Sequence, residues 1–421
     1  MQGSYWIETL GCAKNEVDSD HIAGGLLAEG YVPAARAEDA DLVVVNTCAF
    51  IESARAESVD AILDIGDRRR VGSRLVVTGC LAARAGAEIA EALPEVDLVA
   101  DVGVPVTLRE GPRWRAAPDR LPSLDLMRIP RPPATAPWAY VKIAEGCDRR
   151  CGFCAIPSFR GPQRSRTVDE ILAEVDGLGV EEVVLVSQDL ASFGKDRGAP
   201  GSLETLVRAI AERVHWVRLL YLFPTALNNR LIETIVDTGV PYFDLSLQHV
   251  SPPLLRRMRR PGSRRGILDK IEHIRSLAPD ATLRSSFILG YPGETEEDHD
   301  ELLGFLDEAQ LDWVGLFPYS AEDGTYAAAL DDQVAPALAL ERLRECAELQ
   351  DGITAKRRAQ LVGTTTTVLV DRAGRARSIR EAPEIDGVVT VPEAWSVGTF
   401  RDVVISAAIG PDLEAVGIDE R

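Results

Sequence analysis

Residues 140–154 read YVKIAEGCDRRCGFC, so a short β-rich run leads directly into Cys147, Cys151 and Cys154. A CxxxCxxC spacing gathers three thiols on one side of a turn. Three thiols suit three irons of a four-iron cluster and leave the fourth iron without a protein ligand. A structural zinc ion needs four protein ligands, and no fourth cysteine or histidine lies nearby in the sequence. The spacing therefore favours a cluster, with zinc or a plain apolar core as alternatives.

The segment from Tyr140 to about Ser320 alternates short β-branched runs with amphipathic helical stretches. This pattern predicts repeated βα units around a parallel sheet, and six units predict a partial (β/α)6 barrel, an open relative of the eight-fold barrel. The expected strands are Tyr140–Ala144, Glu182–Val186, Val217–Leu222, Tyr242–Leu247, Thr282–Leu289 and Trp313–Phe317. The expected helices are Val168–Leu178, Leu203–Val214, Asn228–Asp237, Arg264–Leu277 and Glu296–Ala309.

Polar and glycine residues follow most of these strands. In parallel sheets of this kind chemistry gathers at the carboxyl ends of the strands, so we expect these residues to form one mouth around the cysteine loop. They are Ser187, Gln188 and Asp189 after the second strand, Gln248 and His249 after the fourth, Gly290–Glu294 after the fifth and Tyr319–Glu322 after the sixth. His249 is a candidate ligand or acid, and a hydrogen-bonded structural histidine is the alternative.

Residues 4–100 repeat the alternation of strand and helix, which predicts an open parallel sheet. One cysteine follows each expected strand: Cys12, Cys48 and Cys80. Since strand ends of a doubly wound sheet lie along one edge, these three thiols are expected to meet and form a second open cluster site. The alternative is three unrelated buried cysteines. The expected strands are Tyr5–Thr9, Asp41–Val45 and Arg74–Thr78, and the helices are Val17–Ala28, Ser53–Ile65 and Arg84–Leu93.

The rest of the chain divides into a linker and a tail. RIPRPPATAP at residues 128–137 lies in a proline-rich stretch that predicts a semi-rigid connection. After a helical stretch around Leu338–Leu361, short β runs separated by turn residues predict a small five-stranded barrel. Cys346 lies within the helical stretch and is expected to be structural. The predicted domains are residues 4–110, the linker 111–137, the core 138–355 and the tail 358–421.

Composition narrows the class of protein. The 421-residue chain has a net charge of −20, which argues against a nonspecific nucleic-acid binder and fits a basic partner or a small substrate. No apolar run approaches the roughly 18 residues that span a bilayer, and the N-terminus lacks the zones of a signal peptide. We therefore expect a cytoplasmic protein without membrane contact, whose cysteines are ligands or catalysts more readily than disulfides.

The cysteine motifs resemble those of a known family. The CxxxCxxC loop is similar to the signature of radical S-adenosylmethionine enzymes. TLGCAKNEVDSD, VVNTCAFIESARAES and VTGCLAAR resemble the N-terminal domain of the methylthiotransferases within that superfamily. GCDRRCGFCAIPSFRGPQRSR and the late APEIDG are more similar to the RimO branch, which modifies an aspartate of ribosomal protein S-twelve. The tail resembles a TRAM domain, a substrate-holding module.

The resemblance implies a division of labour between two 4Fe-4S clusters. One, on Cys147, Cys151 and Cys154, would give an electron to S-adenosylmethionine, and the adenosyl radical would remove hydrogen from the aspartate β-carbon. The other, on Cys12, Cys48 and Cys80, would hold the sulfur that becomes the methylthio group. It also implies an electron donor such as flavodoxin or ferredoxin. The residues that it places near S-adenosylmethionine are Phe153, Ser187, Gln188, Asp189 and Gly290.

Charge bears on the choice of substrate. Between residues 361 and 421 Asp and Glu outnumber Lys and Arg by ten to six, which should repel transfer RNA and attract a basic ribosomal protein. Arg372, Arg375, Arg377 and Arg380 are expected to form one basic patch. The alternatives are a MiaB-like enzyme that modifies an adenosine of transfer RNA, and a non-catalytic iron–sulfur assembly or ribosome-binding factor.

Overall fold

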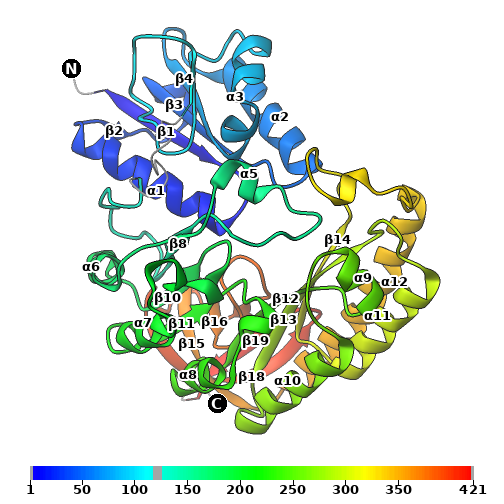
Figure 1. Ribbon diagram of the computed structural model, residues 1–421. Helices are drawn as coiled ribbons and strands as arrows, with labels where there is room; N and C mark the ends of the chain where they lie inside the picture. The colour runs from blue at the N-terminus through cyan, green and yellow to red at the C-terminus, as the bar shows by residue number, and fades with distance from the viewer. Residues whose placement is uncertain (1–2, 117–125, 419–421) are drawn as a thin grey trace.

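The computed structural model describes residues 3–116 and 126–418, which form an N-terminal sheet domain, a central partial barrel and a C-terminal closed barrel (Figure 1). Part of the predicted linker, residues 117–125, lies outside the described residues. The described helices include none that is long and apolar enough to cross a membrane.

The N-terminal domain is a parallel sheet in the order β2-β1-β3-β4-β5-β6, as the open-sheet prediction required. Val43 and Val45 of β3 pack with α2 and α3, while Val44 between them packs with α1 on the other face. Burial on both faces explains the unbroken apolar run of this strand. The elements are β1 (Ser4–Thr9), α1 (Ala13–Ala28), β2 (Val32–Pro33), β3 (Leu42–Thr47), α2 (Glu52–Arg68), β4 (Arg74–Gly79), α3 (Cys80–Ala92), β5 (Leu98–Ala100) and β6 (Trp114–Arg115).

The strands that the periodicity did not indicate are short. β2 and β6 each contain only two residues, too few to show an alternating pattern. β6 falls at the start of the predicted linker and pairs with β5 through Val99 and Trp114. The sheet therefore extends past residue 110, while the domain boundaries themselves remain a prediction.

The central domain contains the six expected strands in two parallel sheets, β11-β10-β7 and β12-β13-β14. A single bridge between Leu222 and Leu245 joins the two sheets into a partial barrel. Its strands are β7 (Trp138–Lys142), β10 (Glu182–Val186), β11 (Trp216–Leu219), β12 (Tyr242–Gln248), β13 (Thr282–Leu289) and β14 (Trp313–Pro318).

Helices cover the outer face of this barrel and share one apolar core with the strands. Two of them begin with capping boxes: Thr167 with Glu170 on α6, and Thr295 with Asp298 on α11. These caps explain why the expected helix starts agree with the structure. The helices are α6 (Val168–Leu178), α7 (Ser202–Ala211), α8 (Asn229–Asp237), α10 (Arg264–Leu277) and α11 (Glu296–Ala309).

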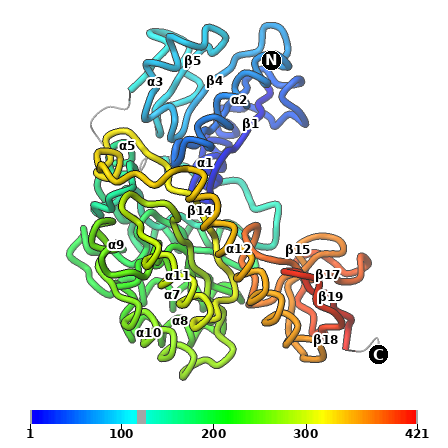
Figure 2. The backbone as a smooth tube through the Cα atoms, turned by 90° about the vertical axis from the view of Figure 1, so that its right-hand side faces the viewer, coloured from blue at the N-terminus to red at the C-terminus, as the bar shows by residue number. Residues whose placement is uncertain are grey.

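The helix before the tail is α12 (Pro336–Ala359), where Cys346 is fully buried in the core of the central domain, as expected of a structural residue. A closed five-stranded barrel follows, in the order β15-β16-β17-β19-β18, and it lies beside the central domain, away from the N-terminal sheet (Figure 2). Its strands are β15 (Thr365–Arg372), β16 (Arg375–Ser378), β17 (Val389–Thr390), β18 (Phe400–Ile409) and β19 (Asp412–Gly417).

The loop between β16 and β17 contacts the strands of the central barrel. Tyr140 donates a hydrogen bond to the Pro383 carbonyl at 3.1 Å, and Trp313 donates one to the Arg380 carbonyl at 2.9 Å. Tyr242 donates a third to Asp386 at 2.5 Å. The tail is therefore integrated with the core through buried polar contacts.

This packing corrects the expected basic patch in the tail. Arg377 is buried, with ion pairs to Glu182 at 2.7 Å and Asp371 at 2.6 Å. Arg380 pairs with Asp280 of the central domain at 3.3 Å. The prediction was wrong because the sequence does not show which part of the tail packs against the central domain, where Glu182 and Asp280 pair with Arg377 and Arg380.

Candidate functional site

The three N-terminal cysteines lie at the carboxyl ends of β1, β3 and β4, which are neighbours in the sheet. Cys12 is the N-cap of α1, Cys48 directly follows β3 and Cys80 is the first residue of α3. Gly11 has a φ of +96°, and a Cβ added to it would lie 2.7 Å from the Cys48 sulfur. The charges of Cys12 and Cys80 both act on Cys48, so the three thiols lie near one another, and Gly11 leaves no room for a side chain beside Cys48.

Burial dominates the electrostatics of this N-terminal triad. It raises the pKa of Cys48 to about 11 and raises the pKa of Cys80. Burial alone would also raise the pKa of Cys12, but Lys14, backbone donors and Arg160 lower it on balance. Buried thiols need a nearby cation to ionise, and bound metal supplies one.

The second triad is held by backbone hydrogen bonds from distant loops. The Cys147 amide donates to the Gly161 carbonyl at 3.0 Å, and the Gly152 amide donates to Met258 at 2.8 Å. Burial raises the pKa of Cys147 to about 11, and the charges of Cys147 and Cys151 both act on Cys154. The three thiols of this loop therefore share one site as well.

The donor set of each triad suits an iron–sulfur cluster. Within residues 3–116 and 126–418, no three His, Cys, Asp or Glu side chains converge as ligands of a single metal ion. An open four-iron cluster takes three thiol ligands, each on a different iron, so the three sulfurs need not converge on one metal ion.

The residues after β10 present unpaired polar atoms. Ser187 and Asp189 are buried, and neither the Ser187 hydroxyl nor Asp189 Oδ1 has a hydrogen-bond partner among the described residues. The other Asp189 oxygen accepts from Arg149 at 2.6 Å. The Gln188 amide donates to Glu145 at 2.7 Å, and its carbonyl oxygen is buried. These free acceptors fit a ligand amine.

Phe153 and Gly290 have neighbours that explain them without a ligand. Phe153 packs against a small apolar cluster that includes Met258 and Tyr291. Gly290 has a φ of +75°, and an added Cβ would lie 2.4 Å from the Ala339 Cβ on α12. Their contact with a cofactor stays a prediction.

His249 is a buried neutral histidine. Its Nδ1 accepts a hydrogen bond from the Ser251 amide at 3.1 Å. Burial lowers its pKa to about 4, and the charges of His299 and Arg342 act in the same direction, against Asp298. This geometry supports the alternative that His249 is a hydrogen-bonded structural histidine and not a ligand or acid.

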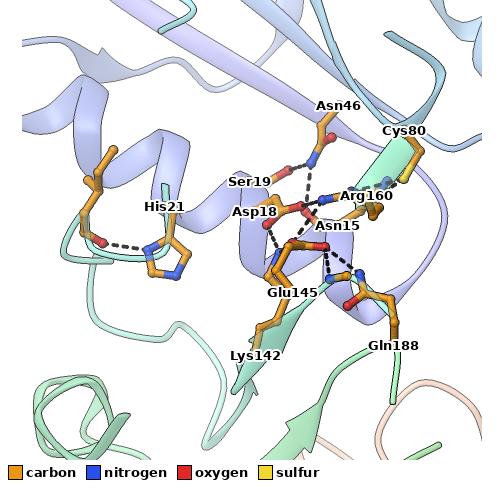
Figure 3. A network of polar contacts seen from close by, with 12 residues as sticks. Asn15, Asp18, Ser19, His21, Asn46, Cys80, Lys142, Glu145, Arg160 and Gln188 are labelled. Atoms are coloured by element: carbon orange, nitrogen blue, oxygen red, sulfur yellow. Dashed lines mark hydrogen bonds and ion pairs between the residues drawn. The ribbon is translucent and has the colours of Figure 1, made fainter. Parts of the chain in front are cut away.

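A buried network of polar residues, which the sequence did not indicate, runs from Cys80 of the first triad to Glu145, two residues before Cys147 of the second (Figure 3). Arg160 is the last residue of α5 (Ile156–Arg160), and its Nη2 lies 3.0 Å from the Cys80 sulfur. Asp18 on α1 pairs with Arg160 at 3.0 Å and also with Lys142. Glu145 accepts from Lys142 at 2.7 Å. The one feature of the sequence that could have indicated these residues is that they lie close to the cysteine motifs.

The ion pairs keep this network charged. Burial would raise the pKa of Glu145, but Lys142 and Arg160 outweigh it and lower the pKa to about 2. Glu145 also accepts from the Gly146 amide at 3.2 Å, directly before Cys147. A second set of charges, Arg55 and Arg84 with Glu322, links the N-terminal domain to the loop after β14.

A partial barrel with a cysteine triad at its strand ends is the architecture of a radical S-adenosylmethionine protein. Three sequence families match in chain order: the uncharacterized protein family UPF0004 over residues 4–101, the radical SAM superfamily over 141–306 and the TRAM domain over 362–418. S-adenosylmethionine and 4Fe-4S clusters are the cofactors that this membership implies.

The chain belongs to the RimO family of radical SAM methylthiotransferases. "Ribosomal protein uS12 methylthiotransferase RimO" of Saccharopolyspora erythraea is 42% identical over 96% of this chain and 93% of that protein. The protein of the same name from Roseiflexus sp. is 40% identical over 97% of this chain and 96% of its own length.

A solved structure shares the fold. The radical S-adenosylmethionine methyltransferase TsrM from Kitasatospora setae, with cobalamin and a 4Fe-4S cluster bound, aligns with a TM-score of 0.50 at 14% identity. The alignment covers 94% of this chain and 84% of TsrM. At this identity the likeness concerns the fold alone.

Proposed function

We propose that this enzyme transfers a methylthio group to the β-carbon of an aspartate in ribosomal protein uS12. The observation that carries the proposal is the identity of about 40% with RimO proteins of two organisms over nearly the whole of both chains. The two triads support it, since one site for cleavage and one for sulfur are what the reaction needs.

We infer that each triad holds one 4Fe-4S cluster: one on Cys12, Cys48 and Cys80, the other on Cys147, Cys151 and Cys154. When bound, the cluster on the second triad supplies the single electron that radical chemistry requires. The protein's part would be to hold each loop by backbone hydrogen bonds and to offer three thiols at each site, so that one iron of each cluster would lack a protein ligand.

The chain's own residues after β10 would hold S-adenosylmethionine. Asp189 Oδ1 and the Ser187 hydroxyl are buried acceptors without partners in the described part of the chain, which suits the charged amine of that cofactor. Gln188 is oriented by Glu145. Phe153 and Gly290 would bound the same site through packing and backbone contact.

A basic protein substrate fits the charge of the molecule better than transfer RNA does. The net charge is −20, and several arginines of the two arginine-rich stretches, residues 256–260 and 372–380, are engaged within the protein. Arg260 contacts the Cys151 sulfur, Arg257 pairs with Asp332, and Arg377 is buried. RNA binding needs a continuous exposed basic surface.

The experiment that tests the substrate uses reduced, reconstituted enzyme with S-adenosylmethionine and offers purified uS12 and a transfer RNA bearing isopentenyladenosine side by side. We expect mass spectrometry to find one hydrogen of a uS12 aspartate replaced by a methylthio group, and unmodified RNA. A methylthio group on the RNA and none on the protein would contradict the proposal in favour of the MiaB-like alternative.

The reaction also needs a one-electron donor, for which a flavodoxin or a ferredoxin is our proposal. A ribosomal substrate favours the cytoplasm as the place of action.

A further inference from the structure

Each cysteine triad has one sulfur that accepts a hydrogen bond from the side chain of an arginine. Arg160 Nη2 lies 3.0 Å from the Cys80 sulfur, and Arg260 Nη1 lies 3.3 Å from the Cys151 sulfur. Both arginines are nearly buried, with 5% and 7% of their surface exposed. Because a buried charge acts through a low dielectric, each guanidinium exerts a strong field on the sulfur that it contacts.

Arg160 reaches the N-terminal triad from the central domain. It lies six residues after Cys154, on α5, which contacts α3 of the N-terminal domain. Asp18 and Asn15 of that domain accept from it at 3.0 and 3.1 Å, and Glu145 accepts at 3.2 Å (Figure 3). These partners fix the guanidinium so that Nη2 points at Cys80.

Arg260 is fixed in a different way. It donates to the Ser246 carbonyl, and its guanidinium carbon lies 4.2 Å from the centre of the Phe223 ring. Arg149 lies over the same ring at 3.9 Å. Arg160 at the end of α5 and Arg260 in the loop before α10 therefore each contact one triad, and they are held by different partners.

We propose that Arg160 and Arg260 are positioning residues that set the reduction potentials of the two clusters separately. Arg160 acts on the cluster of Cys12, Cys48 and Cys80, and Arg260 acts on the other. The inference rests on the proposed function, since it requires both clusters. A reduced cluster carries one more negative charge, so a cation and a hydrogen bond at its sulfur stabilise the reduced form and raise the potential.

The test measures midpoint potentials by electron paramagnetic resonance in full-length variants that keep one cluster. Changing Cys147, Cys151 and Cys154 together to alanine leaves the N-terminal cluster, and changing Cys12, Cys48 and Cys80 leaves the other. Arg160→Gln and Arg260→Gln are each made in both backgrounds. We expect Arg160→Gln to lower only the N-terminal potential and Arg260→Gln to lower only the other.

Lysine variants separate this role from simple support of the fold. Arg160→Lys and Arg260→Lys keep the charge, so each should recover part of the lost potential. A purely structural arginine would change stability and leave both potentials unmoved. Unchanged potentials in iron-loaded variants, or equal shifts of both clusters by one substitution, would overturn the proposal.

Iron content distinguishes failure of this proposal from failure of the proposed function. If the background that keeps only Cys12, Cys48 and Cys80 binds no iron, the second cluster is refuted, and the Arg160 half of the proposal with it. The role of Arg260 is then still tested by the redox titration of the cluster on Cys147, Cys151 and Cys154.

Discussion

Single residues decide whether the thiols of the N-terminal triad can meet. Gly11 is the clearest case, because both its φ of +96° and the Cys48 sulfur 2.7 Å from an added Cβ exclude a side chain. Gly30 has a similar φ of +88° with open space around it, so it offers a matched control.

We therefore predict that Gly11→Ala displaces Cys48 and halves the iron bound per chain, while Gly30→Ala keeps full iron. Both substitutions carry the same backbone cost of about 1–2 kcal/mol, so the difference between them reports the contact with the cysteine. Iron analysis after anaerobic reconstitution checks this. Equal iron in the two variants would show that residue 11 does not shape the site.

His249 makes stability depend on pH. Its pKa is lowered from 6.5 to about 4 by burial, so the unfolded chain binds a proton that the folded chain rejects. The contribution is complete above about pH 6.5 and is lost as pH falls toward 4. The free energy of unfolding should decrease by up to about 3 kcal/mol across that window on account of this residue.

Chemical denaturation of the apo-protein between pH 7 and pH 4 measures the effect. In His249→Asn the amide oxygen can still accept from the Ser251 amide. The free energy of unfolding of this variant should therefore fall by up to about 3 kcal/mol less between pH 7 and pH 4 than that of the unchanged protein. The same slope in both proteins would mean that His249 is protonated in the fold.

At the scale of elements, α12 packs directly on the loop after β13. Gly290 allows this approach, since a Cβ there would lie 2.4 Å from that of Ala339. We predict that Gly290→Ala lowers the free energy of unfolding by about 2–4 kcal/mol, from backbone strain and overpacking together.

Adding Ala339→Gly should restore part of this loss, because it removes the clash and leaves the strain. Thermal and chemical denaturation of the single and double variants measure both effects. If the double variant is no more stable than Gly290→Ala alone, the helix contact is not what requires glycine.

The sequence predicted well those helices and strands that are long enough to show a periodic pattern of apolar residues. The strands and helices of the partial barrel recur at regular spacing, and the positions of the six cysteines follow from the topology of parallel sheets. Two-residue strands such as β6 show no period. The network around Arg160 joins residues 18, 145 and 160, and such distant polar partners leave no local pattern to find.

At the scale of the whole molecule, buried ion pairs join the three domains. Arg377 of the tail contacts Glu182, the first residue of β10, whose side chain is fully buried. Arg375 lies two residues earlier on the same strand and is exposed.

We predict that Arg377→Ala destabilises the protein by about 3–5 kcal/mol, since it leaves Asp371 without its arginine and removes one of the two cations, Arg218 being the other, that pair with buried Glu182. Arg375→Ala should change stability by no more than about 0.5 kcal/mol. Urea denaturation of the two variants makes the comparison. Equal stability of the two variants would show that the ion pairs of Arg377 do not help to attach the tail to the core.

The central claim is that two separate cysteine triads each hold a cluster and that only one of them cleaves S-adenosylmethionine. Iron and reductive cleavage, measured on the same preparations of the two triple variants, test it most directly. The intact protein should bind about eight irons. Changing Cys147, Cys151 and Cys154 to alanine should halve the iron and abolish cleavage. Changing Cys12, Cys48 and Cys80 should also halve the iron but preserve cleavage, and full iron in that variant would contradict the claim.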